Sequence, residues 1–213
     1  LAHALSDESL EFETFEQSSI CPITVPVLIE KASMAVIAFG VAPIRRVQKR
    51  GSPRQRWLER HEQENGRRRD LSRRCIKRTL EYLEDLLAGG DATMVTDCKS
   101  AYETALRRLF GDQITHIQHP GSLPRTTFNP LFRINLTEAM LRDNLGRLRR
   151  RSWLHTKNRR RLRLHLELYA SYRNLVRKRT NHDSPDTTPA TVLGLIARPL
   201  SRVEVLAWRQ DWG

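Results

Sequence analysis

The sequence contains few cysteines and no arrangement of them that would stabilise a small domain. Its 213 residues include three, Cys21, Cys75 and Cys98, which lie far apart and form no C-x-x-C pair. Disulfide frameworks and zinc ribbons need more cysteines at closer spacing, so the sequence excludes both classes. Isolated thiols in odd number favour a reducing compartment, and we therefore expect a cytoplasmic protein.

Long apolar runs are also missing. The longest stretch, from Met34 to Ile44, is about half of the roughly 20 residues that a membrane-spanning helix needs. The N-terminal segment is acidic, whereas a signal peptide begins with basic residues. We expect no segment that crosses a membrane.

Acidic residues are scarce where basic residues gather. The formal net charge is +13 and the pI is about 10.6. Residues 142–179 hold fourteen Lys and Arg but only two acids, Asp143 and Glu167, and residues 45–74 hold twelve against four. Ion pairing cannot neutralise such blocks, so a polyanionic partner is expected. A nucleic acid is the first candidate and an acidic membrane surface the second.

The apolar and turn residues predict an α/β domain with a mixed sheet. Three β-rich runs come first, as consecutive antiparallel strands, and Pro26 should either weaken the second of them or place it at an edge. Helices then alternate with strands. The expected elements are strands at 12–16, 22–31, 34–41, 93–96 and 114–117, and helices at 71–87, 100–110, 130–150 and 157–177.

One carboxylate stands at the end of a predicted strand. In MVTDCKSAY, residues 94–102, an apolar run stops at Asp97 and a helix follows. Asp97 could cap that helix by accepting a backbone N–H bond. It could instead be a metal ligand, because chemistry in open α/β sheets gathers at the carboxyl ends of strands. Metal-dependent phosphoryl transfer would then require further carboxylates at the same point.

Further candidates lie on the first strand and on the helix after residue 130. Glu11 and Glu13 share a face of the strand, which could equally be a solvated acidic face. Asn135, Glu138 and Arg142 are spaced i, i+3 and i+7 beside an apolar stripe. That spacing suits polar groups at the margin of a cleft, or an ordinary helix surface.

Several blocks resemble the DDE-type insertion-sequence transposases, which have an RNase H-like catalytic domain. The resemblance covers nearly the whole chain, and the run NPLFRIN with RLRRRSW is its most specific part. The blocks are EFETFE (11–16), ICPITVPVLIEK (20–31), VTDCKSAY (95–102), NPLFRIN (129–135), MLRDNLGRLRRRSW (140–153), HLELYASYRN (165–174) and TPATVLGL (188–195).

The resemblance implies an α/β fold, an RNase H-like mixed sheet flanked by helices, with a helical, basic C-terminal extension. Residues 1–153 would form the catalytic domain, with a basic insertion at about 45–88. Residues 154–213 would be the extension packed on it. No N-terminal DNA-reading region precedes the catalytic part, so a truncated or degenerate element is expected.

The same resemblance assigns the metal site. Asp97 takes the second acidic position, and the third falls near Asn135, with Glu138 one turn further as the carboxylate alternative. Asp97 and Glu138 would then hold Mg²⁺ or Mn²⁺. At the first position the family's acidic pair is replaced by Leu10-Glu11, and leucine cannot bind a hard cation that prefers oxygen. Either Glu11 or Asp7 substitutes through a shift in register, or the site is broken.

The second basic block predicts a DNA-binding surface. Its arginines and lysines would contact phosphates without reading bases, the alternative being a solvated helix face. Trp153 lies among them, and burial between helices is expected for it. The predicted DNA-binding residues are Arg142, Arg147, Arg149, Arg150, Arg151, Lys157, Arg159, Arg160 and Arg161.

The leading hypothesis is a transposase-like protein that cuts and rejoins DNA with a divalent metal, weakened or inactivated by the loss at Leu10. The resemblance implies DNA as the partner, without a membrane, and is compatible with a homo-oligomer. The alternative is a non-catalytic, basic DNA-binding remnant. An RNA-binding protein is the third hypothesis, and the lack of an interleaved aromatic and basic motif disfavours it.

Overall fold

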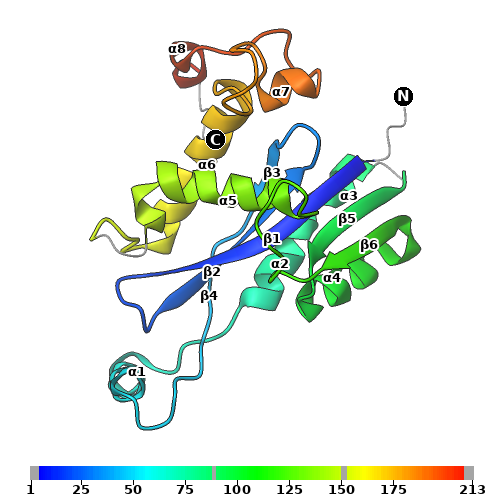
Figure 1. Ribbon diagram of the computed structural model, residues 1–213. Helices are drawn as coiled ribbons and strands as arrows, with labels where there is room; N and C mark the ends of the chain where they lie inside the picture. Colours follow the sequence, from blue (N-terminus) through cyan, green and yellow to red (C-terminus); the bar gives the residue numbers. More distant parts are fainter. Residues whose placement is uncertain (1–4, 88–89, 150–152, 209–213) are drawn as a thin grey trace.

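A computed structural model describes residues 5–87, 90–149 and 153–208 of the chain (Figure 1). Strands and helices alternate after an initial hairpin. The elements are β1 (Leu5–Phe15), β2 (Pro22–Glu30), β3 (Val36–Phe39), β4 (Ala42–Pro43), α1 (Pro53–Asn65), α2 (Ser72–Leu80), α3 (Tyr82–Leu87), β5 (Ala92–Asp97), α4 (Ser100–Phe110), η1 (Gly111–Gln113), β6 (Ile114–His119), α5 (Phe132–Asn144), η2 (Gly146–Leu148), α6 (Arg159–Leu175), α7 (Pro189–Val192) and α8 (Arg202–Leu206).

The six strands form one mixed sheet in the order β3-β2-β1-β5-β6, with β4 paired to β2 beside β3. β1 is antiparallel to β2 and parallel to β5, and β5 is parallel to β6. The short connection between β1 and β2 allows a hairpin, whereas the parallel strands are joined through helices. β1 is therefore the strand at which the antiparallel and parallel halves of the sheet meet.

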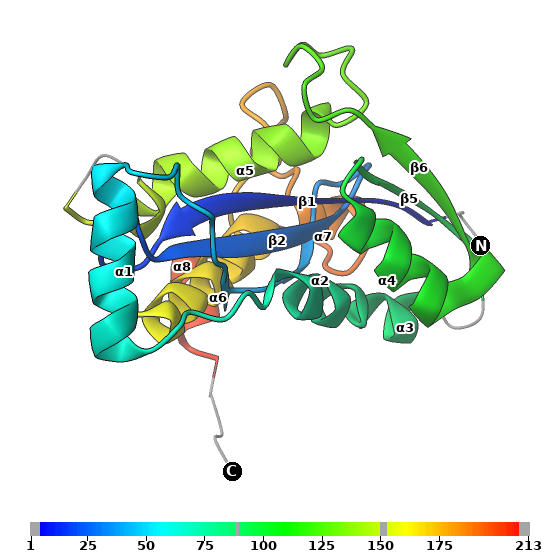
Figure 2. The same cartoon turned by 90° about the horizontal axis from the view of Figure 1, so that it is seen from below.

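Helices cover both faces of this sheet. Figure 2 shows α5 on one side and α2, α3 and α4 on the other. One apolar cluster joins alternate residues of β2, such as Val25 and Val27, to Ile134 and Leu141 of α5 and Leu162 of α6. A second cluster joins the opposite face to α2, α3 and α4. β2 is buried along its whole length because it is covered on both faces, which explains its nearly continuous apolar sequence.

The predicted edge position of β2 is wrong, because β2 pairs with β1 on one side and with β3 and β4 on the other. Pro26 is tolerated because it lies between the two short pairings. Thr24 is the last residue paired with β4, and Val27 is the first paired with β3. Between them the Gly40 N–H donates to the Pro26 carbonyl at 2.9 Å. Because Pro26 is paired with neither β3 nor β4, its missing N–H removes no hydrogen bond to either strand.

The helix predictions were partly confirmed. The helix at 100–110 has the expected bounds, whereas the segment 71–87 divides into α2 and α3, and the helix expected at 130–150 ends at Asn144. α6 buries Leu162, Leu166 and Tyr169, which lie on one face of the helix. Its Asn174 side chain also bonds both backbone groups of Val36 in β3, at 2.9 and 2.8 Å. α6 therefore shares its core with the sheet. The division into domains stays a prediction.

Candidate active site and basic surface

Asp97 is the last residue of β5 and lies half-buried at the carboxyl end of that strand. Its Oδ1 accepts the backbone N–H of Lys99 at 3.2 Å, so the carboxylate bridges the turn between β5 and α4. Burial raises the pKa of Asp97, and the bond from Lys99 opposes that rise. Lys99 itself is the N-cap residue of α4, and its side chain makes no capping bond. Asp97 therefore organises the turn between β5 and α4.

Glu138 approaches the same region from α5. It is only 5% exposed and lies beside Thr137 and Leu141 on the helix side that faces the sheet. Asn135 lies at the margin of that side, where its amide donates to the Leu131 carbonyl of its own helix at 2.8 Å. Of the two candidates for the third acidic position, the structure turns Glu138 inward and Asn135 along the helix.

The buried ring of Tyr102 shows how Asp97 and Glu138 relate to each other. Tyr102 is fully buried on α4, and its pKa is raised first by burial and then by the charges of Asp97 and Glu138, among others. Both carboxylates must therefore lie within electrostatic reach of one phenol oxygen. The assignment of Asp97 and Glu138 as metal ligands stays a prediction.

The β1 position beside Asp97 is occupied by leucine. Ser9 is paired with Thr96, so Leu10 lies next to Asp97 in the continuing register. Neighbouring residues on parallel strands point to the same face of a sheet. Leu10 packs against the apolar cluster under α5, which is also the face of Val95. The first acidic position of the resemblance therefore coincides with an apolar side chain.

Neither proposed substitute lies on that face. Glu11 and Asp7 are an odd number of residues away from Leu10, so their side chains emerge on the opposite side of β1. There Glu11 pairs with the Lys99 ammonium and accepts the Thr24 hydroxyl at 2.8 Å. The proposed register shift is not found, because β1 pairs with β5 in a regular register from Leu5 to Ser9.

The acid that does share the face of Leu10 was missed by sequence reasoning. Glu8 lies two residues before Leu10 and is completely buried. Its Oε2 accepts the backbone N–H of Ile134 on α5 at 2.9 Å, and its Oε1 lies 3.3 Å from the Lys31 ammonium. Because alternate residues of a strand share a face, the two-residue spacing from Leu10 would have identified Glu8. These contacts tie β1 to the start of α5.

The donor set does not fit a two-ion centre. Within the described ranges, no group of three or more His, Cys, Asp or Glu side chains is arranged to hold a metal ion. Asp97 and Glu138 supply two carboxylates, which together would suit at most one hard cation that keeps most of its water. Two-ion phosphoryl transfer needs a bridging ligand, and Leu10 stands where it would be.

Among the residues predicted to bind DNA, four of those described form an exposed group at the start of α6: Lys157, Arg159, Arg160 and Arg161. Asn158 caps this helix by accepting the N–H groups of Arg160 and Arg161. Arg159 pairs with Glu16 at 3.0 Å. We call these four residues the α6 basic end.

The other predicted DNA contacts are placed differently. Arg142 lies over the Phe12 ring, 5.0 Å from its centroid, and is half-buried. Arg147 is half-buried, and Arg149 is exposed and donates to the Asp143 carbonyl at 3.0 Å. Arg150 and Arg151 lie outside the described residues.

The expected burial of Trp153 is wrong. Its side chain is 84% exposed, because α5 ends before it and the chain turns there before α6 begins. An exposed indole therefore lies in the same stretch of chain as the α6 basic end. No helix in the described part of the chain combines the length and apolar character needed to cross a membrane.

Comparisons with known proteins give structural likeness without sequence relatives. No model of a protein family and no curated protein matches. One similar solved structure is the simian T-cell lymphotropic virus intasome in complex with PP2A regulatory subunit B56 gamma. It is 11% identical with a TM-score of 0.47, over 93% of this chain and 58% of the other. A second is the catalytic core domain of BIV integrase, 12% identical with a TM-score of 0.43, over 89% and 93%.

The sheet itself identifies the fold. Three antiparallel strands are joined at β1 to a parallel pair, with helices on both faces, and this order is that of the RNase H-like fold. The predicted α/β fold class is confirmed.

Proposed function

We propose that this chain is a DNA-binding protein built on the catalytic fold of a DDE-type insertion-sequence transposase, with an incomplete metal site. The observation that carries the proposal is the α6 basic end, where four cationic side chains are exposed. Within the described part of the chain, Arg159 alone among them has a carboxylate partner, Glu16. Such a surface binds phosphates and loses affinity steeply as salt rises. A cytoplasmic protein that acts as a homo-oligomer on DNA would be compatible with this reading.

The contacts of Glu11 and the position of Leu10 favour binding over cleavage. A first ligand would have to emerge beside Asp97, and the side chain there is apolar. Glu11 is held on the other face by Lys99 and Thr24, so recruiting it would break a half-buried ion pair and flip the strand. The chain would therefore hold DNA without cutting it.

Salt-dependent binding to a labelled 20-base-pair duplex tests the proposal. The variant Arg160→Ala/Arg161→Ala should lower the slope of log K against log salt by about 2, because each lost phosphate contact contributes about 0.9. Arg107→Ala/Arg108→Ala is the matched control, since it removes two exposed arginines from α4 at the other end of the molecule (Figure 2). Equal effects of the two variants would refute a specific role for the α6 basic end.

A second candidate function is metal-dependent DNA cleavage and strand transfer. The charges of Asp97 and Glu138, which both raise the pKa of Tyr102, favour it. A divalent ion bound there would supply charge neutralisation at the phosphate, and the chain's own part would be to hold that ion through Asp97 and Glu138.

Nicking of supercoiled plasmid in Mg²⁺ and in Mn²⁺ separates the two candidates. The proposal predicts no nicking by the wild-type chain and a gain in Leu10→Asp that Leu10→Asp/Asp97→Ala loses. Wild-type nicking that disappears in Asp97→Ala would establish the enzymatic candidate instead. Thermal unfolding of each variant shows whether a loss reflects the site or the fold.

A further inference from the structure

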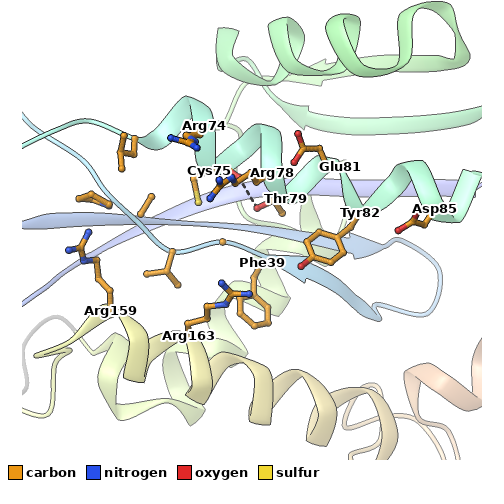
Figure 3. A pocket seen from close by; sticks show the side chains of 15 residues that line it. Phe39, Arg74, Cys75, Arg78, Thr79, Glu81, Tyr82, Asp85, Arg159 and Arg163 are labelled. Carbon is orange, nitrogen blue, oxygen red and sulfur yellow. Dashed lines mark hydrogen bonds between the residues drawn. The ribbon is translucent and has the colours of Figure 1, made fainter. Parts of the chain in front are cut away.

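A groove lies outside the candidate active site, between α2 and α6 (Figure 3). Its volume is about 620 Å³, and its floor is the outer edge of the sheet from Phe39 to Pro43. Among the strands that the structure describes, β3 and β4 pair only with β2, so none of them extends the sheet at this edge. The groove therefore follows exposed backbone between two helices.

Arginines line the groove from both walls. Arg74 and Arg78 come from α2, and Arg159 and Arg163 come from α6 (Figure 3). Arg159 and Arg163 pair with Glu16 and Glu167 at 3.0 Å each. Arg74 and Arg78 have no ion-pair partner among the described residues, so they remain available to an anion.

The buried thiol of Cys75, on α2, lies against Gly40 of the groove floor. Burial raises the pKa of its thiol to about 11, and the charges of Arg78 and Arg163 oppose that rise. One arginine from each helix thus acts on the same buried sulfur. The groove is also lined by two acids, Glu81 just before α3 and Asp85 within it.

An aromatic side chain adds a second kind of contact. Tyr82, at the start of α3, lines the groove and is 52% exposed. Figure 3 shows its ring extending across the gap toward α6. Its neighbour Glu81 is already paired with Lys77, so this carboxylate is partly neutralised.

We propose that this groove binds single-stranded DNA, with its phosphates on the arginines of α2 and α6 and a base stacked on Tyr82. Sequence-independent single-strand sites combine a basic groove with aromatic platforms. A duplex keeps its bases stacked inside and would leave Tyr82 without a role. The groove is continuous with the α6 basic end, because Arg159 belongs to both. The proposal therefore rests on the proposed function and adds single-stranded DNA to the duplex DNA proposed there.

Binding to a labelled oligo-dT and to a duplex of equal length tests this. Tyr82→Ala should weaken oligo-dT binding at least about fivefold and leave duplex binding unchanged, because stacking contributes at this scale or above. Tyr82→Phe keeps the ring and should retain the affinity. Arg74→Ala/Arg78→Ala should lower the single-strand salt slope by about 1.4, at about 0.7 per contact. Arg107→Ala/Arg108→Ala serves as the matched control.

The outcomes separate this proposal from the proposed function. Unchanged oligo-dT binding by Tyr82→Ala, or equal losses for oligo-dT and duplex, would overturn the groove as a single-strand site. Displacement of oligo-dT by polyglutamate of equal charge would overturn it in favour of an acidic peptide. If Arg160→Ala/Arg161→Ala changes duplex binding no more than the control variant does, the proposed function is refuted. If oligo-dT binding still depends on Tyr82 in that case, the groove remains a single-strand site.

Discussion

Replacing Asp7 by asparagine should stabilise the protein at alkaline pH and flatten its pH dependence. Asp7 lies in β1 opposite Glu30 and is 1% exposed, and neither of its oxygens has a hydrogen-bond partner in the described structure. Burial, and secondarily the charge of Glu30, raises its pKa to about 7 from 3.8. The folded state therefore keeps a proton that the unfolded chain releases well below neutrality.

The magnitude follows from linkage. Because the folded-state pKa is the higher one, stability is lost as pH rises from about 4 to about 7 and stays at the lower level above that. A shift of this size corresponds to about 4 kcal/mol in total, of which about 3 kcal/mol falls between pH 5 and pH 8. For a chain of this length, that loss lowers the melting temperature by roughly 6–12 °C.

Urea unfolding at pH 5, 6, 7 and 8 measures the effect. Wild-type protein should lose stability over this series, and Asp7→Asn should lose about 3 kcal/mol less, because the amide carries no titrating proton. Asp91→Asn is the control, since Asp91 is exposed at the start of β5. An unchanged pH slope in Asp7→Asn would show that Asp7 is not the titrating group and would refute the reasoning.

Two other predictions concern packing. Gly40→Ala should lower the free energy of unfolding in urea by about 1–3 kcal/mol, because its methyl group would collide with Cys75, Thr79 and Pro26. Gly121→Ala is the control, since a methyl group there would make only ordinary contact. A loss in Gly40→Ala no larger than that in Gly121→Ala would contradict this prediction. Asn174→Ala should cost about 1–3 kcal/mol by leaving backbone groups of Val36 unpaired. If hydrogen exchange in β3 stays as slow as in wild type, that link between α6 and β3 does not hold the edge.

Asp7 also shows why the acidic residues of β1 were hard to assign from sequence. Three acids flank Leu10, and any of them could replace a lost ligand on composition alone. Strand geometry excludes Asp7 and Glu11, because a one-residue difference reverses the face of the side chain. The pairing of β1 with β5 then decides which face Asp97 shares, and that face carries Leu10 and Glu8. The register is a tertiary property, since the two strands are about 80 residues apart.

The sequence by itself determined the order and type of most elements, the inward stripe of α6 and the excess of positive charge, because periodicity and composition are local properties. It also exposed the leucine where an acid was expected. Only the tertiary structure decided that Glu138 is buried on the inner side of α5, that Trp153 is exposed, and that α2 and α6 face each other across an arginine-lined groove. These features depend on how distant segments pack against the sheet, and no local pattern of residues specifies that packing.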